Sequence, residues 1–166
     1  MLFHLFVYTQ AMDRDKILIY VDHVGRFYAQ RYGFSPVTGR LIGYLSVCEP
    51  MEQSINDIAE ALLTSRSAIN NAVKMLETQN LIHRLRPAGT RADLISLSPL
   101  NSKNMGFDPS EYQELASLAR EGLGLLDNAS PERRQALELT VSLNEFLAEK
   151  LPQLYEEWNE HYKNRK

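Results

Sequence analysis

Residues 54–79 read SINDIAEALLTSRSAINNAVKMLETQ, a pattern that predicts two short helices separated by a tight break. Ser54 and Asp57 have the spacing of a capping box, in which two side chains satisfy free amides at the start of a helix. Ser65 is placed to cap a second helix over 66–79, where apolar residues recur at intervals of three and four. Two short helices joined by so brief a turn predict a helix-turn-helix unit.

The sequence changes from a helical to a strand-like pattern directly after this unit. Residues 81–86 roughly alternate between apolar and polar side chains, and residues 93–97 can form the return strand after a turn at 87–90. A hairpin in this position is a wing. The fold class that we expect is therefore mainly α with a small β-hairpin wing, arranged as a winged helix-turn-helix.

A longer helix is predicted on the N-terminal side of the winged segment. Apolar residues at helical spacing indicate a helix over 13–32. The Ser-Pro pair at 35–36 then begins a second helix, which the Glu-Pro pair at 49–50 stops. Residues 1–11 are either native structure or an extension in front of it.

Two further helices are predicted on the C-terminal side. Asp108 and Ser130 have the character of N-cap residues, each followed by proline, and they indicate helices that continue to about residues 127 and 162. The last helix is apolar on more than one side, so a partner chain is its simplest cover. We expect three regions: an N-terminal extension and dimerisation helix over 1–35, a winged helix-turn-helix DNA-binding domain over 36–98, and a helical dimerisation region over 99–166.

Charge is distributed unevenly along the chain. The net charge is −3, but residues 64–91 contain five arginine or lysine residues and one acid. Residues 108–161, in contrast, contain twelve acids and four basic residues. A local basic segment on an acidic body is expected of a DNA-binding surface in a protein whose remainder serves another purpose.

The positions predicted to be exposed on the second helix are polar, and none is acidic. Short hydrogen-bonding side chains near a helix N-terminus, with longer cations beyond them, suit contact with the DNA major groove. The guanidinium of Arg66 can bind guanine through two hydrogen bonds, and the amide of Asn70 or Asn71 can bind adenine in the same way. Lys74 fits a contact with the phosphate backbone.

Further cations lie around the predicted wing. Arg84 and Arg86 share one face of a strand, and Arg91 is nearest the hairpin tip, where a minor-groove or phosphate contact is expected. Taken singly such residues are often merely solvated, but their combination with two capped helices favours binding to double-stranded DNA. The predicted DNA-binding residues are Ser65, Arg66, Ser67, Asn70, Asn71, Lys74, Arg84, Arg86, Thr90 and Arg91.

Two other classes of function compete with DNA binding. An enzyme is not expected, because the sequence contains no glycine-rich phosphate loop, no nucleophile motif and no metal-binding pair, and it indicates no cofactor. The main alternative is a winged helix that contacts a protein without binding DNA sequence-specifically. The second helix of such a module would tolerate acids and apolar residues on its outer face, and its binding need not weaken steeply with salt.

Composition also bears on location. The single cysteine, Cys48, cannot form an internal disulfide, and it has no second cysteine with which to build a zinc site. The sequence shows no signal peptide, and no apolar run approaches the roughly 18 residues that indicate a membrane helix. We therefore expect a cytoplasmic protein with no membrane partner.

Five segments carry a resemblance to a known family: Gly39-Arg40-Leu-Ile-Gly43-Tyr44-Leu45, Glu49-Pro50, Ile55-x-x-Ile58-Ala59-Glu60-Ala61-Leu62, Ser65-Arg66-Ser67 and Leu76-Glu77-x-x-Asn80-Leu81-Ile82. They resemble the GbsR/MarR group of bacterial and archaeal transcriptional regulators, and the first is most similar to the GbsR-like branch. The resemblance covers about residues 13–97. It implies a homodimer, expected to be a repressor, that reads a pseudo-palindromic operator with two recognition helices and two wings. It also implies a small-molecule effector that tunes affinity.

The sequence departs from the family pattern at two positions. Wings of this family usually carry a cluster of acid and arginine at the tip, whereas here Arg91 is followed by Ala92, which leaves more of the wing contact to Arg84 and Arg86. Asn80 stands where a glycine is common after the recognition helix. Asparagine tolerates the left-handed backbone conformation, so the turn is expected to form.

Overall fold

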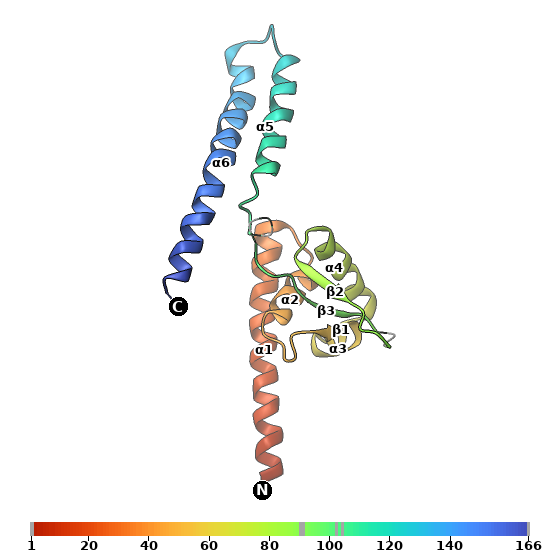
Figure 1. Ribbon diagram of the computed structural model, residues 1–166. Helices are drawn as coiled ribbons and strands as arrows, with labels where there is room; N and C mark the ends of the chain where they lie inside the picture. Colours follow the sequence, from red (N-terminus) through yellow and green to blue (C-terminus); the bar gives the residue numbers. More distant parts are fainter. Residues whose placement is uncertain (1, 90–91, 102, 104, 166) are drawn as a thin grey trace. The chain divides into compact units, whose positions relative to one another are not determined.

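A computed structural model of the chain describes residues 2–89, 92–101, 103 and 105–165, and for residues 2–13 it describes the backbone alone. It contains two compact units, Met1–Pro99 and Leu100–Lys166 (Figure 1). The first unit is built from α1 (Leu2–Tyr32), α2 (Pro36–Leu45), β1 (Gln53–Ser54), α3 (Ile55–Ala61), α4 (Arg66–Thr78), β2 (Ile82–Leu85) and β3 (Leu94–Leu97). The second unit is built from α5 (Pro109–Gly124) and α6 (Pro131–Lys163). This mainly helical architecture with one small antiparallel sheet confirms the expected fold class.

The predicted starts of the two short helices are confirmed, because local hydrogen bonds set each of them. Ser54 Oγ accepts from the amide of Asp57 at 3.2 Å, and the Asp57 carboxylate accepts in return from the Ser54 amide at 3.4 Å. Ser65 Oγ accepts from the amide of Ala68 at 3.2 Å where α4 begins. After α4, Asn80 has a φ of 56°, which is the left-handed conformation expected of it.

Two predicted boundaries in the first unit were wrong. The helix predicted over 13–32 begins at Leu2, since residues 2–12 contain no proline or glycine that would stop it. The next helix ends at Leu45, well before the Glu-Pro pair that was expected to stop it. There the hydroxyl of Ser46 donates to a backbone carbonyl of the preceding turn at 2.7 Å and offers the chain an alternative to helical hydrogen bonding.

Glycines bring α1 and α2 into close contact. A Cβ placed on Gly43 would lie 2.9 Å from the Cβ of Val24, and one placed on Gly39 would lie 2.8 Å from the Cα of Gly25. Both distances are far shorter than the roughly 3.5–4.0 Å at which carbon atoms attract one another. The two glycines in the Gly-Arg-Leu-Ile-Gly-Tyr segment therefore serve helix packing.

The core of the first unit lies among its four helices and its sheet. Burial of an aliphatic side chain contributes roughly 1.5–3 kcal/mol before conformational entropy is subtracted. Because one side of α4 is held in this core, its opposite side faces outward. The largest fully buried side chains are Val21, Thr38, Leu41, Ile58, Leu62, Ile69, Val73, Leu76 and Ile95.

The sheet has three antiparallel strands in the order β1–β3–β2, of which the sequence indicated two. The expected hairpin is formed by β2 and β3, with Ile82 opposite Leu97 at one end of the ladder. The unexpected strand is β1, in which Gln53 lies opposite Ile95. A strand of two residues is too short to show an alternating pattern, so periodicity alone does not reveal it.

The second unit is a pair of helices that buries few side chains. Among its described residues, Ala116 and Ala119 of α5 and Asn144 of α6 are buried. The first helix ends at Gly124 instead of near residue 127 as predicted, and glycine residues disfavour the helical conformation through their backbone entropy. None of the helices in the described part of the chain is both long and apolar enough to cross a membrane.

The outer face of α6 carries an apolar stripe. Leu139, Leu143 and Phe146 recur at intervals of four and three, so they lie on one face of the helix. Their exposed fractions are 63%, 57% and 56%. We call these three residues the α6 stripe.

Candidate nucleic-acid interface

The side of α4 that faces away from the core carries a line of exposed polar side chains. Ser67, Asn71 and Lys74 were predicted to be exposed there, and Thr78 continues the same line. Their intervals of four, three and four place all four on one face of the helix. No acid lies among them, and we call these four residues the α4 stripe. Thr78 was missed by the sequence analysis, although its spacing from Lys74 is a signal that could have found it.

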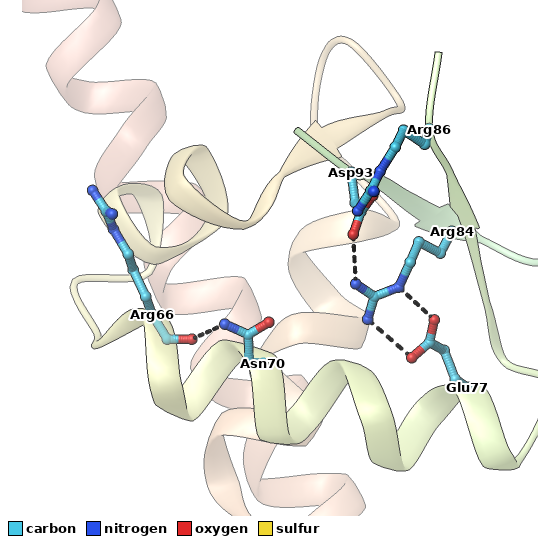
Figure 2. A network of polar contacts seen from close by, with 6 residues as sticks. All are labelled: Arg66, Asn70, Glu77, Arg84, Arg86 and Asp93. Atoms are coloured by element: carbon cyan, nitrogen blue, oxygen red, sulfur yellow. Dashed lines mark hydrogen bonds and ion pairs between the residues drawn. The ribbon is translucent and has the colours of Figure 1, made fainter. Parts of the chain in front are cut away.

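Arg66 and Asn70 lie one turn apart on the same side of α4 as Glu77 (Figure 2). Their helical spacing places this side next to the α4 stripe. The Asn70 Nδ2 atom donates to the backbone carbonyl of Arg66 at 3.0 Å, which uses one of its two amide hydrogens. The side chain of Asn70 is half-buried, whereas Asn71 is exposed in the α4 stripe. Of the two asparagines proposed from the sequence for adenine recognition, Asn71 is therefore better placed.

The serines at the N-terminus of α4 have a structural role as well. Ser65 Oγ caps the helix and also lies 3.2 Å from the hydroxyl of Ser67. Free amides of the first helical turn give such a terminus a partial positive charge. Helix N-termini in general favour contact with anionic groups such as phosphate.

Four charged side chains form a continuous network between α4 and the hairpin, at the base of the loop that joins β2 to β3 (Figure 2). Arg84 of β2 donates to Glu77 of α4 through two hydrogen bonds, of 2.6 Å from Nε to Oε1 and 3.0 Å from Nη2 to Oε2. Its Nη1 atom donates to Oδ2 of Asp93 at 2.9 Å. The other oxygen of Asp93 accepts from Nε of Arg86 at 2.6 Å. We call these four residues the wing-base network.

The two arginines of this network differ in exposure. The side chain of Arg84 is 29% exposed and that of Arg86 is 64% exposed. Hydrogen bonds from Arg84 hold the pKa of Glu77 below its ordinary value. Hydrogen bonds from Arg86 and then Arg84 lower the pKa of Asp93 in the same way. Both carboxylates are therefore charged at neutral pH, and the network consists of two anions and two cations.

The predicted DNA-binding residues of the wing thus have different surroundings. Arg86 is exposed, whereas the guanidinium of Arg84 is bonded to carboxylates of its own chain through all three nitrogens. Thr90 and Arg91 lie outside the described residues, so their contacts with DNA stay predictions. Glu77 and Asp93 were not predicted from the sequence to belong to this site.

A weak signal for one of these missed contacts exists in the sequence. The ladder between β2 and β3 places Leu85 opposite Leu94, and one further step along it would place Arg86 opposite Asp93. An acid facing an arginine across a hairpin is a favourable cross-strand pair. The bond between Glu77 and Arg84 gives no such signal, because it joins a helix to a strand whose relative orientation depends on the tertiary fold.

A groove of about 440 Å³ lies along α1 and α2. Its lining is largely aromatic, and the hydroxyl of Tyr20 lies 3.1 Å from that of Ser46 at one side. Burial raises the pKa of Tyr28, so this phenol is neutral at physiological pH. Within the described residues no group of three or more histidine, cysteine or acidic side chains could hold a metal ion. The groove is lined by Tyr20, His23, Val24, Phe27, Tyr28, Ile42 and Ser46.

Comparisons with known proteins match both units. Residues 32–92 match the MarR family, and residues 108–161 match a family described as MmpR5-like MarR family transcriptional regulators. HTH-type transcriptional regulator MmpR5 of Mycobacterium tuberculosis is 33% identical over 127 residues, which are 73% of this chain and 73% of that protein. A crystal structure of a transcriptional regulator superposes with a TM-score of 0.77 at 28% identity and covers 87% of this chain and 99% of that chain.

Proposed function

This chain belongs to the MarR family of transcriptional regulators, and on that premise we propose that it is a homodimeric repressor that binds a pseudo-palindromic operator sequence-specifically. The observation that carries the proposal is the α4 stripe, an exposed, acid-free line of polar side chains on the second helix of a helix-turn-helix. The relatives reported above are transcriptional regulators, and no catalytic activity is proposed. The GbsR-like branch stays a prediction, and so does a cytoplasmic location.

In this proposal α4 lies in the major groove of double-stranded DNA. Asn71 and the flanking Arg66 read base edges, where each good paired contact contributes roughly 1–3 kcal/mol of discrimination. Lys74 and the hydroxyls of Ser65 and Ser67 contact phosphates and fix the position of the helix. The two recognition helices of a dimer would read half-sites about one helical turn apart, ~34 Å.

The wing adds contacts beside those of α4. Arg86 is exposed and cationic, which supports a contact with a phosphate or with the minor groove. Thr90 and Arg91 are proposed for the same region on the ground of their place in the predicted hairpin tip. Asp93 already partly neutralises Arg86, so this contact requires the guanidinium to share its hydrogens between the carboxylate and DNA.

The homodimer part of the proposal is supported by the α6 stripe. An interface core of leucine and phenylalanine side chains is typical of stable homodimers. The α6 helix of a second copy offers the same apolar residues, and a twofold interface pairs a surface with itself. We propose that residues 99–166 and the N-terminal helix form the dimer body, and that residues 36–98 form the reading head.

An effector would act on this dimer by binding one arrangement of the reading heads better than another. The groove along α1 and α2 supports such a ligand, because it is lined by aromatic side chains with a few polar groups at its edge. Its chemistry favours an apolar or aromatic molecule. Quenching or enhancement of protein fluorescence on addition of such molecules, lost in Phe27→Ala, would identify the site.

The experiment that tests the proposed function is a titration of the purified protein against fragments of its own upstream intergenic DNA. It is carried out at two salt concentrations and with excess unrelated competitor DNA. Binding to one fragment that resists competitor and weakens steeply with salt supports a sequence-specific regulator. Weak binding that is equal for every fragment contradicts it and favours a winged helix whose partner is a protein.

A further inference from the structure

The wing-base network connects the recognition helix to both strands of the wing. Arg84 on β2 is the connecting group, because its guanidinium bonds Glu77 on α4 and Asp93 next to β3 at the same time. The exposed fractions of the three side chains are 29%, 32% and 17%, so water competes only in part for these bonds. Paired hydrogen bonds between a guanidinium and a carboxylate are among the stronger and more directional polar contacts in proteins.

We infer that Arg84 is a positioning residue, which holds the wing at a fixed angle to the recognition helix and does not itself contact DNA. The inference rests on the proposed function, and it changes the role that the sequence suggested for this arginine. Through Asp93 the same network also orients Arg86, whose Nε atom is bound to the second oxygen of that carboxylate. Arg86 then presents its remaining nitrogens to DNA from a fixed place.

The cost of the alternative role argues for this assignment. A phosphate contact would require Arg84 to break three hydrogen bonds that its nitrogens make to carboxylates. Glu77 and Asp93 would then be left as neighbouring anions close to a phosphate, which like-charge repulsion opposes. Among the residues that the structure describes, Arg86 contacts one carboxylate, and its side chain is far more exposed, so it can approach DNA without such a loss.

The wing also needs an attachment of this kind. The hairpin strands β2 and β3 contain four residues each, and a two-stranded hairpin is at best marginally stable in water by itself. The third strand, β1, adds only two residues and pairs with β3. Ile82 and Ile95 hold the strands of the wing in the core, and Arg84 adds a polar contact that joins β2 to α4. A wing in the correct position before DNA arrives lowers the ordering cost of binding.

The test uses Arg84→Lys, which keeps the charge but cannot form the forked contact with two carboxylates. Hydrogen exchange is measured on the full-length protein without DNA, in peptides that cover residues 82–97 and, for comparison, α1 and α2. We expect exchange in the wing to accelerate roughly tenfold, which is the effect expected from the loss of one strong hydrogen-bonded contact. Exchange in α1 and α2 should stay unchanged. Arg31→Lys on the exposed face of α1 is the matched control and should change neither region.

Binding to the operator is then measured for the same variants over a range of salt. Arg84→Lys should weaken operator binding roughly tenfold while the slope of log affinity against log salt stays that of the original protein, since the number of phosphate contacts is unchanged. Glu77→Gln alters the other partner of the contact between Arg84 and Glu77, so it should also weaken operator binding. The double variant should therefore lose less affinity than the product of the two single losses predicts.

Three results would overturn the inference. Unchanged wing exchange together with weaker binding would mean that Arg84 contacts DNA directly. Unchanged exchange together with unchanged binding would mean that Arg84 does not position the wing. Exchange that accelerates equally in the wing, α1 and α2 would assign Arg84 to the stability of the whole unit. Failure of the proposed function is a separate result, because the original protein would then bind no fragment selectively while the exchange experiment still reports on the wing.

Discussion

Arg40 of α2 and Asp22 of α1 form an ion pair in which Nε and Oδ1 lie 2.7 Å apart. The same guanidinium donates from Nη1 to the backbone carbonyl of Leu62, directly after α3, at 3.1 Å. One side chain therefore joins the N-terminal helix, the second helix and the turn that leads into the recognition helix. Within the Gly-Arg-Leu-Ile-Gly-Tyr segment, Arg40 therefore links three parts of the unit, while Gly39 and Gly43 allow α1 and α2 to pack closely.

Replacement of Arg40 by alanine should destabilise the first unit. A hydrogen bond from a charged donor contributes about 1.5–3 kcal/mol, and its loss leaves the Leu62 carbonyl without this partner. Urea denaturation should therefore show a fall of about 2 kcal/mol in the free energy of unfolding. Arg26→Ala on the exposed side of α1 is the control. Equal stability of the two variants would show that the contacts of Arg40 contribute nothing beyond those of a surface arginine.

Alanine at Gly43 and at Gly124 should change stability in opposite directions. The new methyl group at Gly43 meets Val24 and Val21 within 3.2 Å, and overpacking of this kind costs about 1–3 kcal/mol. At Gly124, the last residue of α5, no heavy atom lies within 4 Å of the added methyl group. Alanine there should stabilise by up to about 1 kcal/mol through reduced backbone entropy. Thermal denaturation measures both, and a stabilised Gly43→Ala would contradict the close packing of α1 and α2.

The stability contributed by Glu77 should depend on pH. Its folded-state pKa is lowered, first by the hydrogen bond from Arg84, so its contribution is complete above the unfolded pKa of about 4.3 and is lost as pH falls through the folded value. At pH 7 the original protein should therefore be more stable than Glu77→Gln. The difference should shrink as pH falls from about 5 to about 3. A difference in denaturation midpoint that stays constant over this range would mean that Glu77 is not paired in the folded state.

Replacement of Phe146 by glutamate should separate the proposed dimer. The new carboxylate would be buried at one end of the α6 stripe in the proposed interface, where an unpaired charge is strongly unfavourable. Sedimentation velocity should show a monomer at concentrations where the original protein is a dimer, and operator affinity should fall because one reading head binds alone. Leu125→Glu is the control, since Leu125 is 84% exposed and lies outside the stripe. Persistence of the dimer in Phe146→Glu would place the interface elsewhere.

The parts of the fold that could be predicted from the sequence are those that nearby residues determine. Ser54, Ser65 and Asp108 begin helices through bonds to amides two or three residues further along the chain, so their spacing is visible in the sequence. The wing was recognisable from alternation, and the position of Asn80 from its tolerance of a positive φ. The start of α1 was placed at residue 13 instead of Leu2, although no proline or glycine in residues 2–12 stops the helix there.

The parts of the site that could not be predicted depend on contacts between distant elements. Three of the four residues of the α4 stripe, all except Thr78, were predicted from the sequence because a buried helix face implies an exposed one at fixed intervals. The sequence predicted a DNA contact for Arg84, because a strand pattern shows on which face of the strand a side chain lies. It does not show which carboxylates pack against that face. Glu77 and Asp93 form ion pairs with this arginine only when α4 and the hairpin are packed together.

The measurement that most directly tests DNA binding by α4 is the salt dependence of operator binding in Lys74→Ala. If Lys74 neutralises a phosphate, the slope of log affinity against log salt should become shallower by about 0.9 for each half-site, and affinity should fall alike for operator and unrelated DNA. An unchanged slope, with unchanged affinity, would contradict the placement of this face of α4 against DNA.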